Sequence, residues 1–420
     1  MRTKHIGIIG AGIAGLHLGL RLQRLGIACT IITDKTPDQV AAAQLTNMVV
    51  HWPTTLGRER VLGVYHWPTC EHGFSRLHQV IETKERIEIH ARAAQPARAV
   101  DYRIYLPRLM EDFAERGGRL QVRTLDAKHM GRIAEHFDLV VVATPANGFQ
   151  HLFARDNANS PYSRPQRYYL AGLYHGFRSR GSRSATLSIA PGHGEALCFP
   201  FLSRTGLVTA LAIMTPQPDA LAMLRVLSSR PGRPGYCATL LRELEQLHPS
   251  IYSQIDTFRF GLQGEDDLAQ AAVTPVVRRP YLDLGGGKYA IALGDVHVTV
   301  DPLMAQGANV GSYSAFVLAD AIAEADVFDL AFCREVERCR SARVLGASRW
   351  TNAFLQPPDE ARVELMMAMS RDHQLADEYL DDFNRPEWQW EWIGSAESIR
   401  DWLDERRVRT SGVSAALPAR

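Results

Sequence analysis

The segment that most restricts the fold lies at the N-terminus, where a β-rich stretch, HIGII, leads into a glycine-rich turn. Gly10, Gly12 and Gly15 have the spacing G-x-G-x-x-G, and leucines with helical spacing follow them. This pattern predicts a strand, a tight turn and a helix whose N-terminus faces a pyrophosphate group. The next predicted strand, ACTIIT, leads to Asp34, which lies where a ribose-binding carboxylate is expected. The N-terminus is therefore predicted to bind a dinucleotide.

A second nucleotide-binding pattern lies close to residue 300. The apolar strand KYAIAL leads to Gly294 and Asp295, and a glycine-rich turn, QGAN, then opens a predicted helix. An acidic side chain after a strand can bind a ribityl hydroxyl, and a helix N-terminus can face an anionic ring. Because the two patterns are so far apart in the chain, one ligand has to contact both. We interpret that ligand as FAD.

Composition excludes several classes of function. The chain has 47 basic and 46 acidic residues, so no charge excess points to nucleic acid. Its six cysteines form no CxxC pair, which is typical of reduced thiols in a cytoplasmic protein. No apolar run reaches the roughly 20 residues of a membrane helix. The first predicted strand starts at residue 5, so we expect no signal peptide. The histidines lack metal-ligand spacing, and we expect no metal site.

The order of predicted strands and helices indicates an α/β fold with discontinuous domains. Short strands such as LCFPFL and GLVTALAIM alternate with turns in the middle of the chain, which favours a second sheet. We expect a Rossmann-like FAD-binding domain from residues 1–45, 96–155 and 276–330. Residues 46–95 and 156–275 are expected to form a substrate-binding domain with a mixed or antiparallel sheet, and residues 331–420 a helical C-terminal region.

These patterns resemble the flavoprotein monooxygenases with a p-hydroxybenzoate-hydroxylase-like fold, and within them the epoxidase component of styrene and indole monooxygenases. The strings AVDYRIYLPRLM, NSPYSRPQR, GDVHVTVDP, QGANVGSY and FNRPEWQW carry the resemblance through nearly the whole chain. The resemblance implies a two-component enzyme, in which a separate NADH-dependent reductase supplies reduced FAD (FADH2) and this chain reacts it with O2. The implied reaction is epoxidation of a styrene-like or indole-like aromatic alkene by a flavin C4a-hydroperoxide.

The resemblance also implies which residues form the site. Asn47 is expected to orient the substrate or the oxidant through its amide, as the main polar and catalytic contact. The expected substrate pocket comprises Met48, Val49, His51, Phe74, Leu77, Leu303 and Met304. The expected FAD site comprises Gly10, Gly12, Ala14, Gly15, Asp34, Gln44, Arg103, Thr144, Gly294, Asp295, Pro302, Gln306, Gly307, Ala308 and Asn309.

Five positions depart from the pattern of the family. Phe74 and Leu77 stand where a Tyr and a His are usual, and Ala97 replaces a Ser. Gln44 occupies the place of an Arg near the cofactor, and Ala305 replaces a Gly. Leu77 should leave more apolar volume, which favours a bicyclic or substituted ring over bare styrene.

One absence concerns the source of electrons. Single-component hydroxylases of this fold carry D-G-x-x-S-x-x-R after the third strand, whereas this chain has VVVATPANGFQHLF. The chain shows no second nucleotide fingerprint, so we expect electrons to arrive on the flavin. Two alternatives stay open: a single-component NAD(P)H-dependent flavin oxidoreductase or hydroxylase of the same fold, and an inactive flavin-binding homologue. The oligomeric state is also open, with a homodimer as one alternative.

Overall fold

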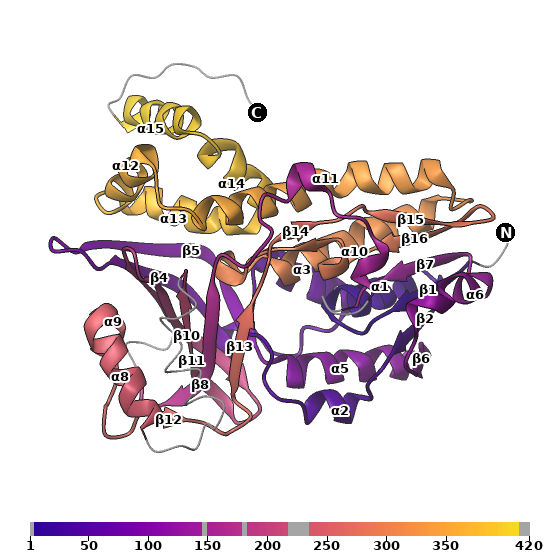
Figure 1. Cartoon of the computed structure of the whole chain (residues 1–420), viewed down its shortest axis with the longest axis horizontal. Coiled ribbons are helices and arrows are strands. Elements are labelled where there is room, and N and C mark those ends of the chain that lie inside the picture. The colour runs from indigo at the N-terminus through magenta and orange to yellow at the C-terminus, as the bar shows by residue number, and fades with distance from the viewer. Residues whose placement is uncertain (1–3, 145–148, 179–182, 217–234, 411–420) are drawn as a thin grey trace.

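The computed structural model describes residues 4–144, 149–178, 183–216 and 235–410 of the chain. Figure 1 shows two large sheets, with the C-terminal helices above both of them. The first sheet has the strand order β15-β16-β7-β1-β2-β6, and all neighbours are parallel except the edge pair β15–β16. Its strands are β1 (His5–Ile9), β2 (Ala28–Thr33), β6 (Arg119–Val122), β7 (Leu139–Val142), β15 (Tyr281–Gly285) and β16 (Lys288–Ala292).

Apolar runs such as LVVV form the central strands because a parallel sheet is covered on both faces. Helices α1 (Ile13–Arg24), α5 (Tyr102–Glu115) and α10 (Gly307–Glu324) bury their leucines and other apolar residues with Ile8 and Val141 on one face. On the other face, α6 (Met130–Glu135) packs with Val140 and Val142. The expected Rossmann-like arrangement is confirmed by this topology.

The second sheet is mixed, in the order β12-β8-β11-β10-β9-β4-β5-β3, and β13 also pairs with β8. Strands β4 and β9 are parallel, whereas most other neighbours are antiparallel. The strands are β3 (Val49–His51), β4 (Gly73–Ile81), β5 (Ile87–Val100), β8 (Tyr168–His175), β9 (Ser184–Ala190), β10 (Gly194–Ser203), β11 (Gly206–Thr215), β12 (Gly261–Leu262) and β13 (Leu268–Ala272). A separate short pair joins β14 (Val276–Val277) to β17 (Val298–Thr299).

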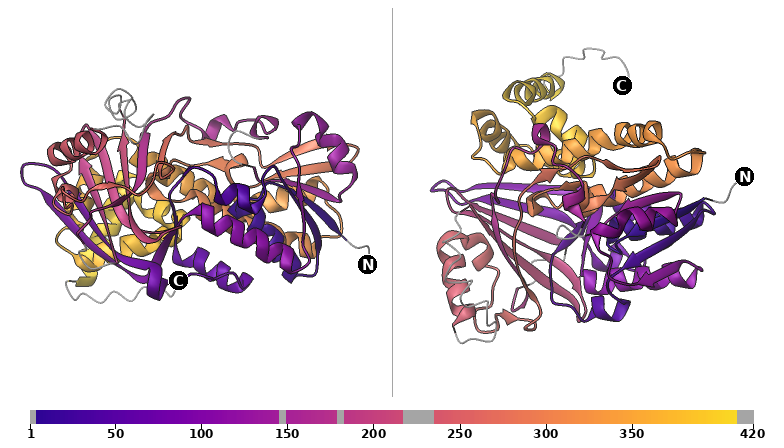
Figure 2. Two further views of the ribbon diagram at one scale, coloured as in Figure 1. Left: turned by 90° about the horizontal axis from the view of Figure 1, so that it is seen from below. Right: turned by 45° about the vertical axis from the view of Figure 1, so that its right-hand side comes forward.

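Alternation along the strands sends neighbouring side chains of the second sheet to different cores. Cys198 packs with helices α8 (Tyr236–Leu247) and α9 (Pro249–Tyr252), while its neighbour Phe199 packs in the core shared with the C-terminal helices. Both views in Figure 2 keep α8 and α9 on the side of this sheet away from the first sheet. The second sheet is therefore covered on both faces.

Aspartates start three of the C-terminal helices. The carboxylates of Asp329, Asp359 and Asp372 each accept a hydrogen bond from the backbone N–H three residues later, which satisfies one amide of the first turn. The helices of this region are α11 (Leu330–Phe354), α12 (Glu360–Met369), α13 (His373–Asp381), α14 (Pro386–Ile393) and α15 (Ala396–Thr410). Among the described residues, no helix is long and apolar enough to cross a membrane.

Helix α11 joins the two halves of the molecule. Near its middle, the buried Arg340 donates to the carbonyls of Ala292 and Pro280 beside the first sheet, at 2.8 and 3.1 Å. Near its end, Trp350 is fully buried against the second core. Strand β5 extends the second sheet to Val100, so the domain boundary expected at residues 95/96 falls inside a strand. The remaining domain limits stay a prediction.

Candidate functional site

The glycine-rich turn between β1 and α1 has little space for side chains. Gly10 has φ +113°, and a Cβ atom placed on it would lie 2.4 Å from the carbonyl oxygen of Ala143. A Cβ on Gly15 would lie 2.1 Å from the carbonyl oxygen of Gly10. Gly12 is the N-cap of α1 and offers no capping side chain, so the first-turn amides keep their capacity to bind an anion. This cradle fits the pyrophosphate of a dinucleotide.

The second predicted nucleotide-binding element contacts the first. Gly294 has φ +62°, and a Cβ on it would lie 3.1 Å from the Cβ of Ala14. A Cβ on Gly311, in helix α10, would lie 3.3 Å from the same atom. Glycines at both positions therefore allow α1, α10 and the turn at Gly294 to pack closely. Two segments nearly 300 residues apart meet here, as a single shared ligand requires.

Three of the expected FAD residues follow strands of the first sheet. Asp34 comes directly after β2, Thr144 lies two residues after β7, and Asp295 lies three residues after β16. Because these strands are parallel, all three residues lie at the carboxyl edge of the sheet, where ligands bind in open α/β folds. Within the described part of the chain, no group hydrogen-bonds the Asp295 carboxylate. The Asp295 side chain is exposed at the surface. The protein around it reduces the hydration of the carboxylate and so raises its pKa, and the positive charge of Arg278 opposes this rise.

Arg103 is bound by protein acceptors, and its contact with the flavin stays a prediction. It was expected to contact the polar chain of the flavin, but its guanidinium binds Asp101 through Nε and Nη2 at 2.7–3.0 Å and Asp267 through Nη2 at 2.6 Å. It also donates to the carbonyl of Asp266 at 3.1 Å, and the residue is only 4% exposed. Burial opposes the charge, but these hydrogen bonds dominate and raise the pKa of Arg103. Arg103 therefore joins the start of α5 to the segment before β13.

Gln44 lies close to the same segment. Its amide donates to the carbonyl of Leu268 at 3.3 Å, and the backbone N–H of Leu45 donates to the carbonyl of Asp266 at 2.8 Å. The side chain is exposed. Its role in binding the cofactor stays a prediction.

The turn before α10 contains a strained residue. Asp301 caps the 3-10 helix Pro302–Met304, accepting from the N–H of Leu303 and from the hydroxyl of Tyr169, and its burial raises its pKa to about 6. Ala305 follows with φ +50°, a left-handed conformation that favours glycine. The substitution of Ala for the usual Gly is thus accommodated by backbone strain.

Helix α10 begins at Gly307 beside buried amide side chains. Gln306 donates from Nε2 to the carbonyls of Met304 and Phe383, while its buried Oε1 has no partner among the described residues. The Asn309 side chain accepts from the N–H of Trp52 and donates to the carbonyl of Val50. The backbone amides of Gly307, Ala308 and Asn309, as the first turn, have no acceptor within the helix. They fit the expected anionic ring, whereas the Asn309 side chain holds strand β3.

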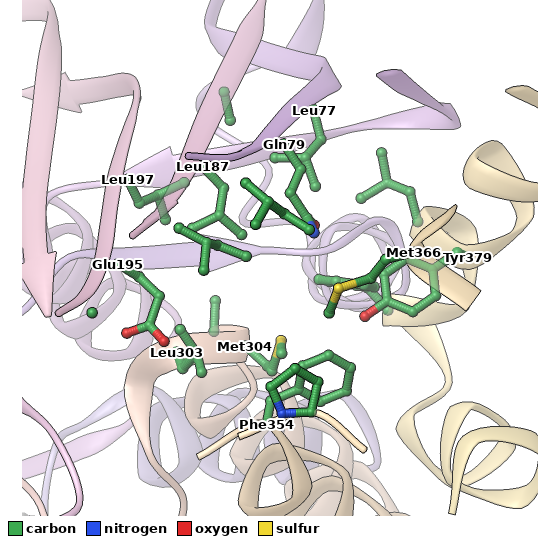
Figure 3. Close-up of a pocket in the computed structure, with 18 of the residues that line it drawn as sticks. Leu77, Gln79, Leu187, Glu195, Leu197, Leu303, Met304, Phe354, Met366 and Tyr379 are labelled. Carbon is green, nitrogen blue, oxygen red and sulfur yellow. The ribbon is translucent and has the colours of Figure 1, made fainter. Parts of the chain in front are cut away.

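An apolar cavity of ≈ 550 Å³ lies between the second sheet and the C-terminal helices. Figure 3 shows the side chains that reach into it from both sides, including Leu77 and Leu187 from the sheet and Phe354 and Met366 from the helices. Ala305 also lines the cavity, so the cavity extends to the turn before α10. Of the expected pocket residues, those lining it are Phe74, Leu77, Leu303 and Met304.

Strand β3 faces this cavity with the side chains that were not expected to line it. Val50 and Trp52 line it, whereas Val49 and His51 do not, because alternate side chains of a strand point to opposite faces. Val49 and His51 therefore do not form a wall of this cavity, and their place in the substrate pocket stays a prediction. The physical reason is the register of β3, in which Val49, Val50 and His51 pair with Val100, Ala99 and Arg98.

Asn47 and Met48 precede β3 and also lie outside the lining of this cavity. Asn47 is exposed, and Met48 is half-buried against the core that contains Phe74 and Met304. Asn47 does not line this cavity, and its contact with the substrate and its catalytic role stay a prediction.

His51 instead belongs to a buried polar network that sequence reasoning missed. Its Nδ1 lies 2.7 Å from Glu59 Oε1, and its Nε2 lies 3.1 Å from the hydroxyl of Tyr102. Arg98 donates from Nη2 to both oxygens of Glu59 at 2.7 Å, and Tyr105 donates to the same carboxylate at 3.0 Å. Of these residues, only His51 was among the expected site residues. Glu59 and Arg98 are 39 positions apart in the sequence, and no local pattern links them.

The charges in this network are well defined. Burial raises the pKa of Glu59, but the hydrogen bond to His51 and the charge of Arg98 outweigh it and lower the pKa to about 2. Burial lowers the pKa of His51, and it lowers that of His17, which bonds to the Tyr105 hydroxyl, to about 3. A carboxylate and a guanidinium are therefore paired among neutral imidazoles beneath β3.

Comparison with known proteins identifies the family. The family model described as "Styrene monooxygenase A putative substrate binding domain" matches residues 146–254. Styrene monooxygenase StyA of Pseudomonas fluorescens is 36% identical over 408 residues, covering 96% of this chain and 98% of that protein. StyA of a second Pseudomonas species matches equally well, with 36% identity over the same shares of both chains. This chain belongs to the styrene monooxygenase family. It is therefore a flavin-dependent monooxygenase.

Solved structures show the same fold at low sequence identity. The flavin-dependent brominase Bmp2 superposes with a TM-score of 0.67 at 14% identity, covering 97% of this chain and all of that chain. PqsL of Pseudomonas aeruginosa, a probable FAD-dependent monooxygenase by its description, superposes with a TM-score of 0.61 at 15% identity over 89% of this chain and 98% of that one. The p-hydroxybenzoate-hydroxylase-like fold expected for this styrene monooxygenase relative is confirmed.

The buried network allows a stability prediction. Glu59→Gln removes the charge that compensates Arg98 and should lower the free energy of unfolding by about 3–5 kcal/mol, measured by urea denaturation. Glu71→Gln, at an exposed glutamate, is the control and should change it by less than about 0.5 kcal/mol. The double variant Glu59→Leu/Arg98→Met should recover part of the loss. A loss below about 1 kcal/mol in Glu59→Gln would contradict the assignment.

The strained turn allows a second prediction. The left-handed conformation costs a non-glycine residue about 1–2 kcal/mol, and glycine adds about 0.5–1 kcal/mol of backbone entropy to lose on folding. Ala305→Gly should therefore raise the free energy of unfolding by about 0.5–1 kcal/mol, measured in the same way. Ala321→Gly, inside α10, is the control and should lower it by about 1 kcal/mol. Destabilisation by Ala305→Gly would show that the turn is not strained.

Proposed function

We propose that this protein is the oxygenase component of a two-component monooxygenase that transfers one oxygen atom from O2 to the double bond of a styrene-like or indole-like aromatic alkene. The observation that carries the proposal is the apolar cavity, which reaches Ala305 immediately before the helix start expected to face the flavin ring. Its volume of ≈ 550 Å³ lies within the range of about 300–1,000 Å³ typical of pockets for small organic ligands. The curated relatives at 36% identity are named for styrene.

The residues would serve two purposes around the cofactor. Reduced FAD supplies the capacity to activate O2 when it is bound. The first-turn amides of α10 would stabilise negative charge on the ring, since fixed dipoles in a water-poor site interact strongly with charge. The walls at Phe74, Leu303 and Met304 would exclude water from the reacting double bond. No acid–base pair of side chains is needed for this transfer.

The ion pair of Arg167 and Glu195 at the cavity favours a neutral substrate. Arg167 lines the cavity, but its guanidinium binds both carboxylate oxygens of Glu195 at 2.9 and 3.0 Å. It also donates to the carbonyl of Leu355, so it is already occupied by protein acceptors. A substrate carboxylate would have to displace Glu195 from its ion pair with Arg167. An apolar aromatic guest meets no such cost, and Leu77 in place of the usual His gives the cavity an apolar side chain where a polar ring would stand.

The proposal includes a separate NADH-dependent reductase. The stretch VVVATPANGFQHLF lacks the D-G and Arg that serve NADPH in single-component enzymes, although its residues 145–148 lie outside the described structure. The cradle at Gly10–Gly15 is the one G-x-G-x-x-G pattern for a pyrophosphate found in the sequence, and the proposed FAD would occupy it. Electrons would therefore arrive on reduced FAD made elsewhere.

The activity is testable directly. Purified protein with a flavin reductase, NADH and FAD should convert styrene or a substituted styrene to its epoxide, detected by gas chromatography, or indole to indigo. The same mixture without this protein is the control. If peroxide forms and none of these substrates is oxygenated, the substrate assignment fails. If no oxygen is consumed beyond the control, the flavin-dependent reaction itself has been misassigned.

Asp295 should contribute to cofactor binding. Its carboxylate faces solvent at the carboxyl edge of the sheet and should accept a hydrogen bond from the ribityl chain. Asp295→Ala should weaken binding of reduced FAD by about 1–3 kcal/mol, measured by anaerobic fluorescence titration. Asp326→Ala, at an exposed aspartate after α10, is the control and should bind as the unmodified protein does. Equal affinity for both variants would remove Asp295 from the site.

A further inference from the structure

A cluster of metal-ligating side chains lies on the β4–β5 hairpin. The register places His78 of β4 directly opposite His90 of β5. Their rings stack with centroids 4.4 Å apart and an interplanar angle of 5°. Glu88 lies two residues before His90 on the same strand, and therefore on the same face. Its Oε2 is 2.9 Å from His78 Nε2 and 3.7 Å from His90 Nε2.

We propose that His78, Glu88 and His90 form a binding site for one divalent transition-metal ion of the Zn²⁺ class. One ligand atom from each residue lies within 4.8 Å of the others. Because the two rings stack in parallel planes, side-chain rotations would turn both ring nitrogens toward one ion. Two imidazole nitrogens and a carboxylate oxygen suit Zn²⁺ and its neighbours, at bond lengths of about 2.0–2.2 Å. The partial exposure of the cluster leaves a position for water as a further ligand.

The charges around the cluster are compatible with an ion. Face-to-face imidazoles would repel each other if both were protonated, so the stacked arrangement favours at least one neutral ring. Neutral imidazole is the form that binds metals. The neighbouring cation, Arg86, contacts the other carboxylate oxygen, Oε1, at 3.2 Å. Oε2 is thereby left directed to the two histidines.

The position of the cluster gives the ion a structural consequence. Gln79 and Ile81 on β4, and Ile87 on β5, line the apolar cavity, and they alternate along the strands with the members of the cluster. An ion held by both strands would fix the hairpin that forms this wall. The inference does not rest on the proposed function, because the three ligands contact neither the cavity nor the expected flavin site.

Calorimetric titration of the tag-free, EDTA-treated full chain with Zn²⁺ tests the site. One equivalent should bind, and His90→Gln should weaken binding by at least about tenfold. His136→Gln, at an exposed histidine beside the first sheet, is the matched control and should bind as the unmodified protein does. Co²⁺ absorption spectra of the same three proteins should show the coordination band in the unmodified protein and the control, and its loss in His90→Gln.

Thermal unfolding provides a second readout. Zn²⁺ should raise the melting temperature of the unmodified protein and of His136→Gln by mass action, and raise that of His90→Gln by less at the same Zn²⁺ concentration. The side chain of His90 is 57% exposed, so its substitution should not disturb folding. Zn²⁺ binding of equal affinity in His90→Gln would place the ion on another group, such as the exposed thiols Cys70 and Cys339, and would overturn the proposal. Absence of any binding would overturn it as well.

Discussion

The contact of Ala14 with Gly294 and Gly311 is the constraint on which the rest of the site depends. Helix α10 can approach the N-terminal βαβ unit only because two glycines face one small side chain. This approach fixes where α10 starts, and the start of α10 fixes strand β3 through the side chain of Asn309, which bonds to Val50 and Trp52. A larger residue at either glycine would separate the two halves of the proposed cofactor site before it affected the cavity.

The register of β3 then decides which side chains meet the substrate. With Asn309 holding the backbone at Val50, the side chains of Val50 and Trp52 face the cavity, and that of His51 faces away. His51 enters a fully buried compartment, where Glu59 and Arg98 compensate each other. Breaking such a pair costs more than its formation contributes, because one charge is left buried. The polar network therefore disfavours the alternative register of β3. A one-residue slip would place the apolar side chain of Val50 among these charges and remove His51 from its partners.

Local patterns in the sequence predict the parts of the fold that depend on short-range physics. The glycine spacing gives the turn at Gly10, and an aspartate followed by an amphipathic stretch gives helix α5 with Asp101 as its cap. Phe74 and Leu77, which the family resemblance assigns to the pocket, both line the cavity, and a register shift in β4 lies between Phe74 and Arg76.

The side of β3 could not be predicted, because alternation makes a one-residue error reverse every side chain. The partners of Arg103 were also out of reach, since Asp267 lies 164 positions away and acts through tertiary packing alone.

The strain at Ala305 connects these constraints to the chemistry. The residue lies between Met304, which lines the cavity, and Gln306, whose buried Oε1 has no described partner. Glycine would relieve the left-handed conformation, so retaining the methyl group costs stability at the junction of cavity and proposed flavin ring. Because Ala305 itself lines the cavity, its methyl group occupies space that a substrate would otherwise use. The methyl group of Ala305 thus narrows the cavity beside the proposed flavin ring, which would hold a broad ring away from the turn and favour approach through its narrow vinyl edge.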